Sequence, residues 1–369
     1  MKNYIIKNAI VLNQDFEFHR GDLKISNGLI VDYEPSNAEM IDAENFYVVP
    51  GLVDIHFHGC AGHDFCEGTY KAFKKILDYE NSIGVTAICP ATMTLPEEKL
   101  ISIMNAAKNF HGLSGIYLEG PFISKNKVGA QNPAYIAKPD IKMFERLQNA
   151  SGNLIKIAAI APEVEGAFDF IGEAKNLTRL TLAHTTCDYD TATRAFTSGV
   201  RQVTHMFNAM PGINHRNPRP IIAALENGKV NIELICDGVH IHPAIIRNTL
   251  KIFGDDRVIF VSDSMEATGM NDGEYELGGL KVIKRGNLAT LEDGETIAGS
   301  VTNLFDCVRT AVNKMNVPLE VAIKCASLNP AKAIGLEKSH GSIALGKVAN
   351  LVLLDKDLNL VRVILEDEI

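Results

Sequence analysis

The sequence predicts an α/β protein: a (β/α)8 TIM-like barrel with a small β-sandwich domain built from both ends of the chain. Three observations support this prediction. Eight short apolar runs alternate with stretches of helical periodicity, both ends are rich in strand-like segments, and reactive side chains recur where the apolar runs end. Parallel strands in a barrel end at one mouth, so the third observation links the fold to a single site.

The two ends of the chain predict the small domain, which we assign to residues 1–50 and 342–369. Residues 4–12 and 22–34 carry alternating β-branched residues, and Asn-Gly and Pro-Gly pairs interrupt the strand-like segments as turns do. The last segment has the same character, with a turn expected near residues 356–359. Because the middle of the chain differs from both ends, we expect the ends to pair with each other.

The barrel is predicted over residues 51–341. Its eight runs are almost continuously apolar, as buried parallel strands are, and helical stretches such as 70–84, 96–110 and 243–254 separate them. Eight strands in roughly 290 residues match a closed (β/α)8 barrel. The structural alternative is a doubly wound open sheet, which the lack of G-x-G-x-x-G after the first strand disfavours.

An insertion follows the eighth apolar run, at about residues 265–300. It is rich in glycine and in short strand-like segments, so we expect a β-hairpin flap over the barrel mouth. Two helical patterns come next, at 301–315 and 319–336. Pro330 lies inside the second pattern and predicts a break there.

The composition is that of an ordinary globular protein, with 369 residues, 46% of them hydrophobic, and a net charge of −9. No Lys/Arg-rich tract is present, so we expect no nucleic-acid partner. No apolar run is long enough to cross a bilayer, and the amino terminus lacks the core of a signal peptide, so we expect no membrane association. Seven cysteines without paired spacing indicate a reducing compartment and predict a cytoplasmic protein.

The most informative pattern lies at the ends of the apolar runs. Two histidines end the first run with one residue between them, and alternate residues of a strand point to the same face, so both imidazoles can share a metal. The plainer alternative is one hydrogen-bonded core histidine and one on the surface. The side chains at run ends that can bind or assist a metal are His56, His58, Glu119, His184, His205 and Asp263.

Glu119, His184 and His205 form the strongest subset. A buried carboxylate needs a partner, and two histidines on neighbouring strands complete the three-ligand pattern of a catalytic zinc site. Asp263 ends the eighth run, where it can take a proton from water and pass it to a leaving group. The alternatives are histidines satisfied by core hydrogen bonds, a glutamate paired with arginine and an aspartate that caps a turn.

Loop residues near the same ends suit substrate binding. Arg216 lies in a Gly/Asn/Pro-rich loop and can hold a phosphate or carboxylate through two parallel hydrogen bonds. His240 follows the seventh run, and the flap offers backbone amides. Each of these features is also ordinary loop chemistry. The candidates are Asn208, Ala209, Arg216, Asp237, His240, Ile297, Ala298 and Gly299.

These motifs resemble those of the amidohydrolase superfamily and, within it, the N-acetylglucosamine-6-phosphate deacetylases. The resemblance implies a barrel of the amidohydrolase type that removes acetate from N-acetyl-D-glucosamine 6-phosphate in amino-sugar catabolism or recycling. The matching segments follow the family's order over nearly the whole chain: PGLVDIHFHG, LEGPFIS, KVGAQNP, LAHTT, THMFNAM, DGVHIHP, VSDSMEATG and GKVANLVLLD.

The resemblance also implies residue roles. Glu119, His184 and His205 match the ligands of the main divalent ion, most often Zn²⁺, with Fe²⁺ or Mn²⁺ as alternatives, and Asp263 matches the acid/base. Members of the family are commonly homodimers or homotetramers, and part of the phosphate site can come from a neighbouring subunit. The positions that match the sugar-phosphate site include the loop and flap candidates named above together with Ala130 and Gln131.

Two departures from the wider pattern are informative. No lysine ends the fourth run, where the superfamily often has a carboxylated lysine, so Glu119 supplies the anion and dihydroorotase-, urease- and hydantoinase-like activities are disfavoured. Some deacetylases lack the His-x-His pair, use one metal and carry a histidine where this chain has Gln131. We therefore expect a second ion at His56 and His58, giving one or two ions per chain. The alternatives are an N-acetylgalactosamine-6-phosphate deacetylase and a catalytically inactive binding protein.

Overall fold

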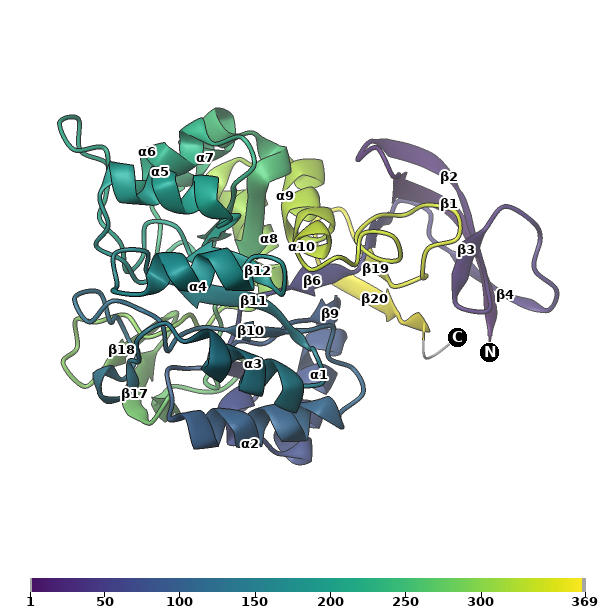
Figure 1. The fold of residues 1–369 in the computed structure, drawn as a ribbon. Helices are drawn as coiled ribbons and strands as arrows, with labels where there is room; N and C mark the ends of the chain where they lie inside the picture. Colours follow the sequence, from purple (N-terminus) through teal and green to yellow (C-terminus); the bar gives the residue numbers. More distant parts are fainter. Residues whose placement is uncertain (1, 367–369) are drawn as a thin grey trace.

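An α/β unit and a β-rich unit lie side by side in the computed structural model, which describes residues 2–366 (Figure 1). The first and last strands of the chain lie together in the β-rich unit, as the purple and yellow ribbons show. Among the described residues, no helix has both the length and the apolar character needed to cross a bilayer.

Parallel strands form the centre of the α/β unit, and each lies within one of the eight predicted apolar runs. Strands β10 to β15 pair in sequence order in one sheet, and β6 pairs in parallel with β9. The bounds are β6 (Leu52–Asp54), β9 (Val85–Ile88), β10 (Ile116–Leu118), β11 (Ile155–Ile160), β12 (Arg179–Leu182), β13 (Gln202–Val203), β14 (Asn231–Ile235) and β15 (Val258–Val261).

Backbone hydrogen bonds extend this arrangement at both edges of the six-stranded sheet. Tyr117 N donates to Pro90 O at 2.9 Å, which joins β10 to the end of β9. Asp263 N donates to His56 O at 2.9 Å, so the end of β15 meets the end of β6. The side chains that follow β6 and β15 are thereby brought together, although more than 200 residues separate them in the sequence.

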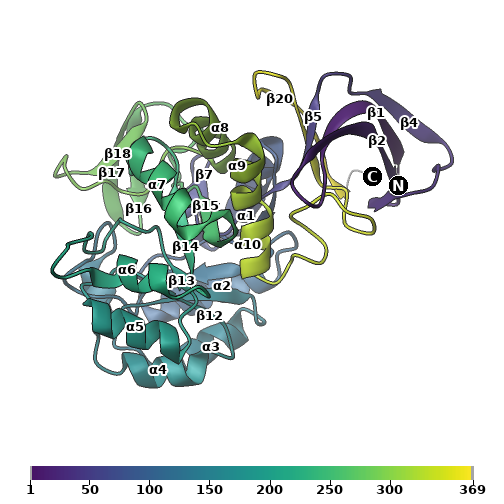
Figure 2. The ribbon, with the colours of Figure 1, turned by 90° about the horizontal axis from the view of Figure 1, so that it is seen from above.

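Helices surround the parallel strands (Figure 2). In α1 the buried stripe of Ala72, Phe73 and Ile76 has the spacing of one helical face, and Thr69 caps the first turn by accepting from Ala72 N. The helices are α1 (Tyr70–Ser82), α2 (Glu97–Lys108), α3 (Ile141–Ala150), α4 (Ala167–Ala174), α5 (Tyr189–Ser198), α6 (Arg219–Glu226), α7 (Pro243–Phe253), α8 (Leu304–Met315), α9 (Leu319–Ala326) and α10 (Leu328–Ala333), with 3-10 turns at η1 (Phe65–Glu67), η2 (Pro133–Tyr135) and η3 (Asp255–Arg257).

The break predicted at Pro330 lies three residues earlier. Helix α9 ends at Ala326, Ser327 has a non-helical backbone, and α10 begins at Leu328 with Pro330 in its first turn. A proline is tolerated in a first turn, but within a longer helix its ring would clash with the carbonyl four residues before it. The chain therefore changes direction before the proline and not at it.

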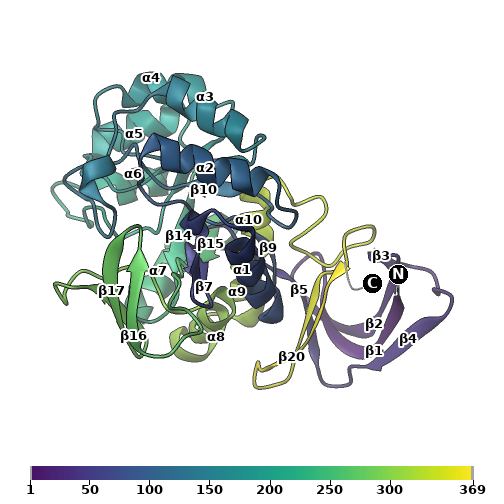
Figure 3. The same ribbon diagram turned by 90° about the horizontal axis from the view of Figure 1, so that it is seen from below.

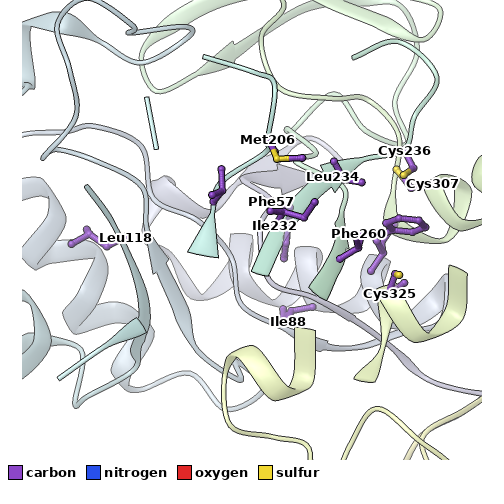
Figure 4. Close-up of a cluster of buried hydrophobic side chains, with 14 of the residues drawn as sticks. Phe57, Ile88, Leu118, Met206, Ile232, Leu234, Cys236, Phe260, Cys307 and Cys325 are labelled. Carbon is purple, nitrogen blue, oxygen red and sulfur yellow. The ribbon is translucent and has the colours of Figure 1, made fainter. Parts of the chain in front are cut away.

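A buried apolar core supports the strand ends (Figure 4). Leu118, Ile232 and Phe260 pack there from three of the parallel strands, all fully buried. Phe57 joins them, so the residue between His56 and His58 anchors that segment in the core. Burial of one such aromatic side chain contributes about 1.5–3 kcal/mol, which fixes the direction of its neighbours.

The two ends of the chain pair as predicted. The sheet order is β20-β19-β5-β1-β2-β3, with β4 paired to β1. All seven strands belong to one hydrogen-bonded sheet, so a division into the two layers of a sandwich stays a prediction, and residues 1 and 367–369 of the predicted domain lie outside the described residues. The strands are β1 (Asn3–Leu12), β2 (Phe18–Ser26), β3 (Leu29–Val31), β4 (Ala38–Asp42), β5 (Tyr47–Pro50), β19 (Leu351–Leu354) and β20 (Leu360–Ile364).

The insertion after β15 forms three antiparallel strands, one more than the predicted hairpin (Figure 3). The turn between the first two is Gly278-Gly279, and both glycines have positive φ, as a tight two-residue hairpin turn requires. The strands are β16 (Gly273–Leu277), β17 (Leu280–Arg285) and β18 (Leu288–Leu291), and a short hairpin of β7 (Gly59–Cys60) and β8 (His63–Asp64) follows β6.

Candidate metal centre

The six strand-end side chains meet at the mouth of the parallel strands, with Glu119 in the middle. One carboxylate oxygen of Glu119, Oε1, lies 3.2 Å from Nε2 of His184 and 3.1 Å from Nε2 of His205. All three residues are buried, and their potential ligand atoms lie within 4.8 Å of one another. We call Glu119, His184 and His205 the first ligand group.

A second ligand group consists of His56, His58 and Glu119, which also lie within 4.8 Å of one another. Glu119 Oε2 is 3.2 Å from His58 Nε2, and Glu119 Oε1 is 3.5 Å from His56 Nε2. Asp263 Oδ1 is 3.3 Å from His58 Nε2. The carboxylate of Glu119 is therefore shared by two sets of imidazoles, as a bridging ligand would be.

The spacing and chemistry of these atoms fit a metal. Ligands held tetrahedrally at 2.0–2.2 Å from one ion lie about 3.3–3.6 Å apart, close to the separations between Glu119 and the four histidines. His56 Nε2 is buried and has no hydrogen-bond partner among residues 2–366, although it faces the carboxylate of Glu119. A buried ring nitrogen without a donor or acceptor partner is suited to a cation.

The electrostatics of the centre also favour a metal ion. Burial alone would lower the pKa of His58, but the carboxylates of Asp263 and Glu119 raise it to about 10. Burial alone would raise the pKa of Glu119, but the charge of His56 and hydrogen bonds from His184 and His205 hold it well below its ordinary value. The carboxylates thus create a strong demand for positive charge, which a divalent ion can satisfy.

The backbone at three of these positions is unusual. His184, His205 and Asp263 have φ values of 42°, 23° and 50°, in a region that residues other than glycine rarely adopt. Such conformations cost of order 1–3 kcal/mol each and cluster at functional sites, where the surrounding structure holds them. Each of the three residues lies two positions after the end of its strand, β12, β13 or β15, where the unusual backbone turns the side chain into the mouth.

Neighbouring loops hold His184 in this conformation. Its Nδ1 donates to Lys127 O at 2.9 Å, which leaves Nε2 free to face Glu119. The carboxylate of Glu163, just after β11, accepts from Thr186 N at 2.6 Å and from the Thr185 hydroxyl, and so ties the loop after β12. The first ligand group therefore depends on loops from several strands.

Gln131 is fully engaged at the centre. Its Nε2 donates to Glu119 Oε2 and its Oε1 accepts from Thr94 N, both at 2.7 Å. The chain after β10 also passes close to Thr94. This approach requires a glycine at position 120, because a Cβ on Gly120 would lie 2.1 Å from Thr94 Oγ1. Gln131 therefore orients the shared carboxylate.

A cavity of about 250 Å³ opens above the ligands. It is lined by most of the residues predicted to bind substrate, and by four that the sequence did not single out, Met93, Gly129, Leu277 and Thr296. Besides Asp263 and four of the five candidate metal ligands (all but His56), the predicted residues that line it are Ala130, Gln131, Asn208, Ala209, His240, Ile297 and Gly299.

Three predicted substrate residues lie outside this lining. Asp237 is buried behind His240, where its Oδ2 accepts from His240 Nδ1 at 2.7 Å, so it orients that ring. Ala298 is fully buried, and its backbone N–H donates to Ala289 within the flap. Arg216 is exposed in its loop, where the sequence alone could not place it relative to the mouth.

Two buried acids beneath the site were missed. Glu233 accepts from His56 Nδ1 at 2.7 Å and from His205 N at 3.0 Å. Asp54 accepts from His56 N at 3.1 Å and from the Ser262 hydroxyl, and burial raises its pKa to about 7. The available signal was a single acidic residue within an apolar run, which sequence patterning treats as an exception.

Comparison with known proteins agrees with this geometry. Residues 47–369 match the model of the amidohydrolase family. The chain belongs to the amidohydrolase family. This amidohydrolase is 30% identical to the N-acetylglucosamine-6-phosphate deacetylase of Bacillus subtilis (strain 168), in an alignment that covers 98% of this chain and 95% of that protein.

Two further relatives bear on specificity. The chain is 29% identical to the N-acetylgalactosamine-6-phosphate deacetylase of Escherichia coli O157:H7, with 99% of each covered. Its fold matches a mutant N-acetyl-D-glucosamine-6-phosphate deacetylase from Mycobacterium smegmatis, solved in complex with N-acetyl-D-glucosamine-6-phosphate. That match has a TM-score of 0.94 and 32% identity, and covers 99% of this chain and 98% of the other.

Proposed function

We propose that this amidohydrolase hydrolyses the N-acetyl group of N-acetyl-D-glucosamine 6-phosphate, which gives D-glucosamine 6-phosphate and acetate. The observation that carries the proposal is the meeting of Glu119, two histidines and Asp263 beneath one small cavity. The 30% identity to a deacetylase of this phosphosugar, over 98% of the chain, supports the substrate.

The metal is part of the proposal. Glu119, His184 and His205 would hold the principal divalent ion, with Zn²⁺ preferred because imidazole and carboxylate ligands with an open position are typical of catalytic zinc. His56 and His58 would hold a second ion that shares Glu119. A divalent ion in such a site acts as a Lewis acid toward the acetyl carbonyl and activates water for attack.

Asp263 is the proposed proton carrier. Burial would raise its pKa, but the hydrogen bond from His58 and the charges of His56 and His58 lower it, so its carboxylate is ready to accept a proton. It takes a proton from the attacking water and returns one to the amine nitrogen, which is a poor leaving group as an anion. Asp263 lines the cavity in which the acetamide would bind.

The remaining polar groups would bind the sugar phosphate. His240 donates through Nδ1 to Asp237, so its Nε2 is directed away from that carboxylate. Burial would lower the pKa of His240, but Asp237 raises it, which favours a cationic ring near an anionic substrate. With Asn208 and the amide of Ala209, it would use phosphate binding to place the distant acetamide.

Arg216 stays in the proposal as a phosphate ligand. Its loop is exposed and the residue does not line the cavity of its own subunit, among residues 2–366. We infer that it serves a site across a subunit interface, in a homodimer or homotetramer. Arg216 would then lie at the rim of the neighbouring subunit's cavity, where its positive charge would contact the phosphate of the substrate.

The finer architecture belongs to the same proposal. The bonds from β9 to β10 and from Asp263 to His56 support a closed eight-stranded barrel at residues 51–341. Residues 1–50 and 342–369 would form a separate β-sandwich domain. Seven free cysteines support a reducing, cytoplasmic location.

Acetate release tests the function. Purified protein is incubated with N-acetyl-D-glucosamine 6-phosphate or N-acetyl-D-galactosamine 6-phosphate, each with and without a chelator. We expect faster release from the glucosamine derivative, loss of activity with chelator and recovery when Zn²⁺ is restored. Preference for the galactosamine derivative would transfer the assignment to the epimer, for which the Escherichia coli relative is a precedent. No release from either would indicate an inactive binding protein.

A further inference from the structure

We propose that Glu233 is a positioning residue that prepares His56 to hold the second metal ion. The proposal rests on the second ion suggested above and goes beyond it, because it explains which side chain makes that ligand group competent. Glu233 lies on β14, beneath the mouth, and its side chain is completely buried.

The contacts of Glu233 come from four residues. His56 Nδ1 is 2.7 Å from Oε2, and the backbone N–H of His205 donates to the same oxygen at 3.0 Å. The Tyr117 hydroxyl donates to Oε1 at 3.2 Å, and Gln202 Nε2 donates there as well. Both carboxylate oxygens are thus saturated by donors, so the side chain cannot turn.

These partners hold Glu233 as a hydrogen-bond acceptor. The N–H groups of the His205 backbone and the Gln202 side chain can only donate, one to each carboxylate oxygen. Gln202 Oε1 in turn accepts from Arg179 Nε at 2.7 Å, and Arg179 is half-buried. Glu233 is therefore linked through Gln202 to a guanidinium, which gives the buried carboxyl group a cationic neighbour.

The consequence for His56 is a defined tautomer. A carboxylate at Nδ1 keeps a proton on that nitrogen, so the lone pair of a neutral ring lies on Nε2. His56 Nε2 is the atom that faces Glu119 at 3.5 Å and has no hydrogen-bond partner among the described residues. Tyr117 also stacks on the ring at a centroid distance of 4.3 Å, so the plane is held as well.

The other histidine of the second ligand group has no such anchor, because His58 Nδ1 lacks a hydrogen-bond partner among residues 2–366. His56 is therefore the histidine of this group whose orientation the buried network determines. Loss of a carboxylate that orients a metal-binding histidine typically weakens metal affinity by about 10- to 100-fold.

The test compares metal binding by wild type and Glu233→Gln. Metal-free protein is titrated with Zn²⁺ against a chromophoric chelator, and with Co²⁺ to follow the absorption bands of each site. We expect two ions per chain in wild type and a second ion weakened about 10- to 100-fold in the variant. The first ion should weaken less, because only a backbone amide of His205 touches Glu233.

Glu80→Gln is the matched control. Glu80 is also a fully buried glutamate, on α1, but its carboxylate oxygens have no hydrogen-bond partner among the described residues. Burial raises its pKa well above the ordinary value, so the folded protein holds a neutral acid there and the amide is a close replacement. We expect both ions to bind Glu80→Gln as they bind wild type.

A double-mutant cycle separates positioning from general structural damage. If Glu233 acts through His56, Glu233→Gln should not alter metal binding further in a His56→Asn background. If Glu233→Gln does not fold, as judged by circular dichroism, Tyr117→Phe keeps the stacked ring and removes one donor to Glu233. That variant should weaken the second ion a few-fold and leave the first unchanged.

The outcomes are distinct. Two ions bound with wild-type affinity by folded Glu233→Gln, or by Tyr117→Phe where that is the variant that folds, would overturn the positioning role while leaving the function intact. Equal losses with and without His56 would assign Glu233 a structural role only. One ion in wild type would remove the second site and this proposal with it, and acetate release would still report the deacetylase activity independently.

Discussion

The two ligand groups meet at Glu119 but stand on different kinds of structure. In the first, His184 and His205 occupy strained positive-φ positions, and His184 is held by the Lys127 carbonyl of a neighbouring loop. In the second, His56 and His58 flank Phe57, which is buried in the apolar core, and His56 is anchored by a buried carboxylate.

One site can therefore combine two kinds of preorganisation. The first ligand group, which the loops support, stores backbone strain that a bound ion can offset. Binding of the first ion should therefore depend on the geometry of those loops. In the second ligand group, the core sets the orientation of the His56 ring before an ion binds. Binding of the second ion should therefore depend on the buried hydrogen-bond network around Glu233.

The largest effect is expected from His184→Asn compared with His56→Asn. Asparagine tolerates positive φ, so His184→Asn keeps the backbone and removes a ligand. We expect its acetate release to fall to that of chelator-treated wild type. His56→Asn should lose one ion per chain and retain a measurable fraction of activity, because the first group remains whole.

Metal content and acetate release, measured on protein purified without chelator, check this contrast. Thermal unfolding of the two variants serves as the control for folding. Equal metal content near one ion per chain in wild type and His56→Asn would remove the second ion from the mechanism. The prediction of a second ion from the intact His-x-His pair and Gln131 would then be wrong.

Asp263→Asn is expected to show the next largest effect. Loss of a general acid/base lowers turnover by about 10²- to 10⁴-fold, and asparagine again suits the φ of 50° at this position. Asp263 lies near both groups but is not a member of either, so metal content should remain at the wild-type level. Steady-state kinetics with metal analysis on the same sample make the check, and near-normal kcat would refute the assigned role.

The sequence predicted the strands and their reactive ends because both follow simple rules. Apolar runs of strand length repeat between amphipathic stretches, and the meeting of strand ends at one mouth is a property of parallel strands. This is why the sequence alone predicts that Glu119, His184, His205 and Asp263 lie together. The parallel topology alone is enough to bring these four side chains together.

The supporting residues could not be predicted in the same way. Glu233 interrupts an apolar strand and Glu163 follows another, and both acquire meaning only from partners far along the chain. Arg216 has the right chemistry for a phosphate, but the path of its loop is set by tertiary contacts. Periodicity reports which face a residue occupies, and not which neighbour it meets.

The smallest effect is expected from Gly129→Ala, which tests the loop-supported side alone. Gly129 has φ of +58°, and an added Cβ would lie 3.3 Å from His184 Cε1. The substitution costs about 1–2 kcal/mol of backbone strain and presses on the His184 ring. We expect the first ion to bind a few-fold to about tenfold more weakly, because the added Cβ displaces the His184 ring from Glu119.

Gly166→Ala is its matched control, because Gly166 also has positive φ, at +87°, but its nearest contact is Pro139 O at 3.6 Å. Both variants should lose similar thermal stability, and only Gly129→Ala should alter chelator competition for the first ion. The ion at His56 and His58 should bind equally in both, because its support comes from the core. If Gly129→Ala lowers the affinity for both ions equally, the shared Glu119 couples the two ligand groups. Their separate supports, in the loops and in the core, would then not make them independent.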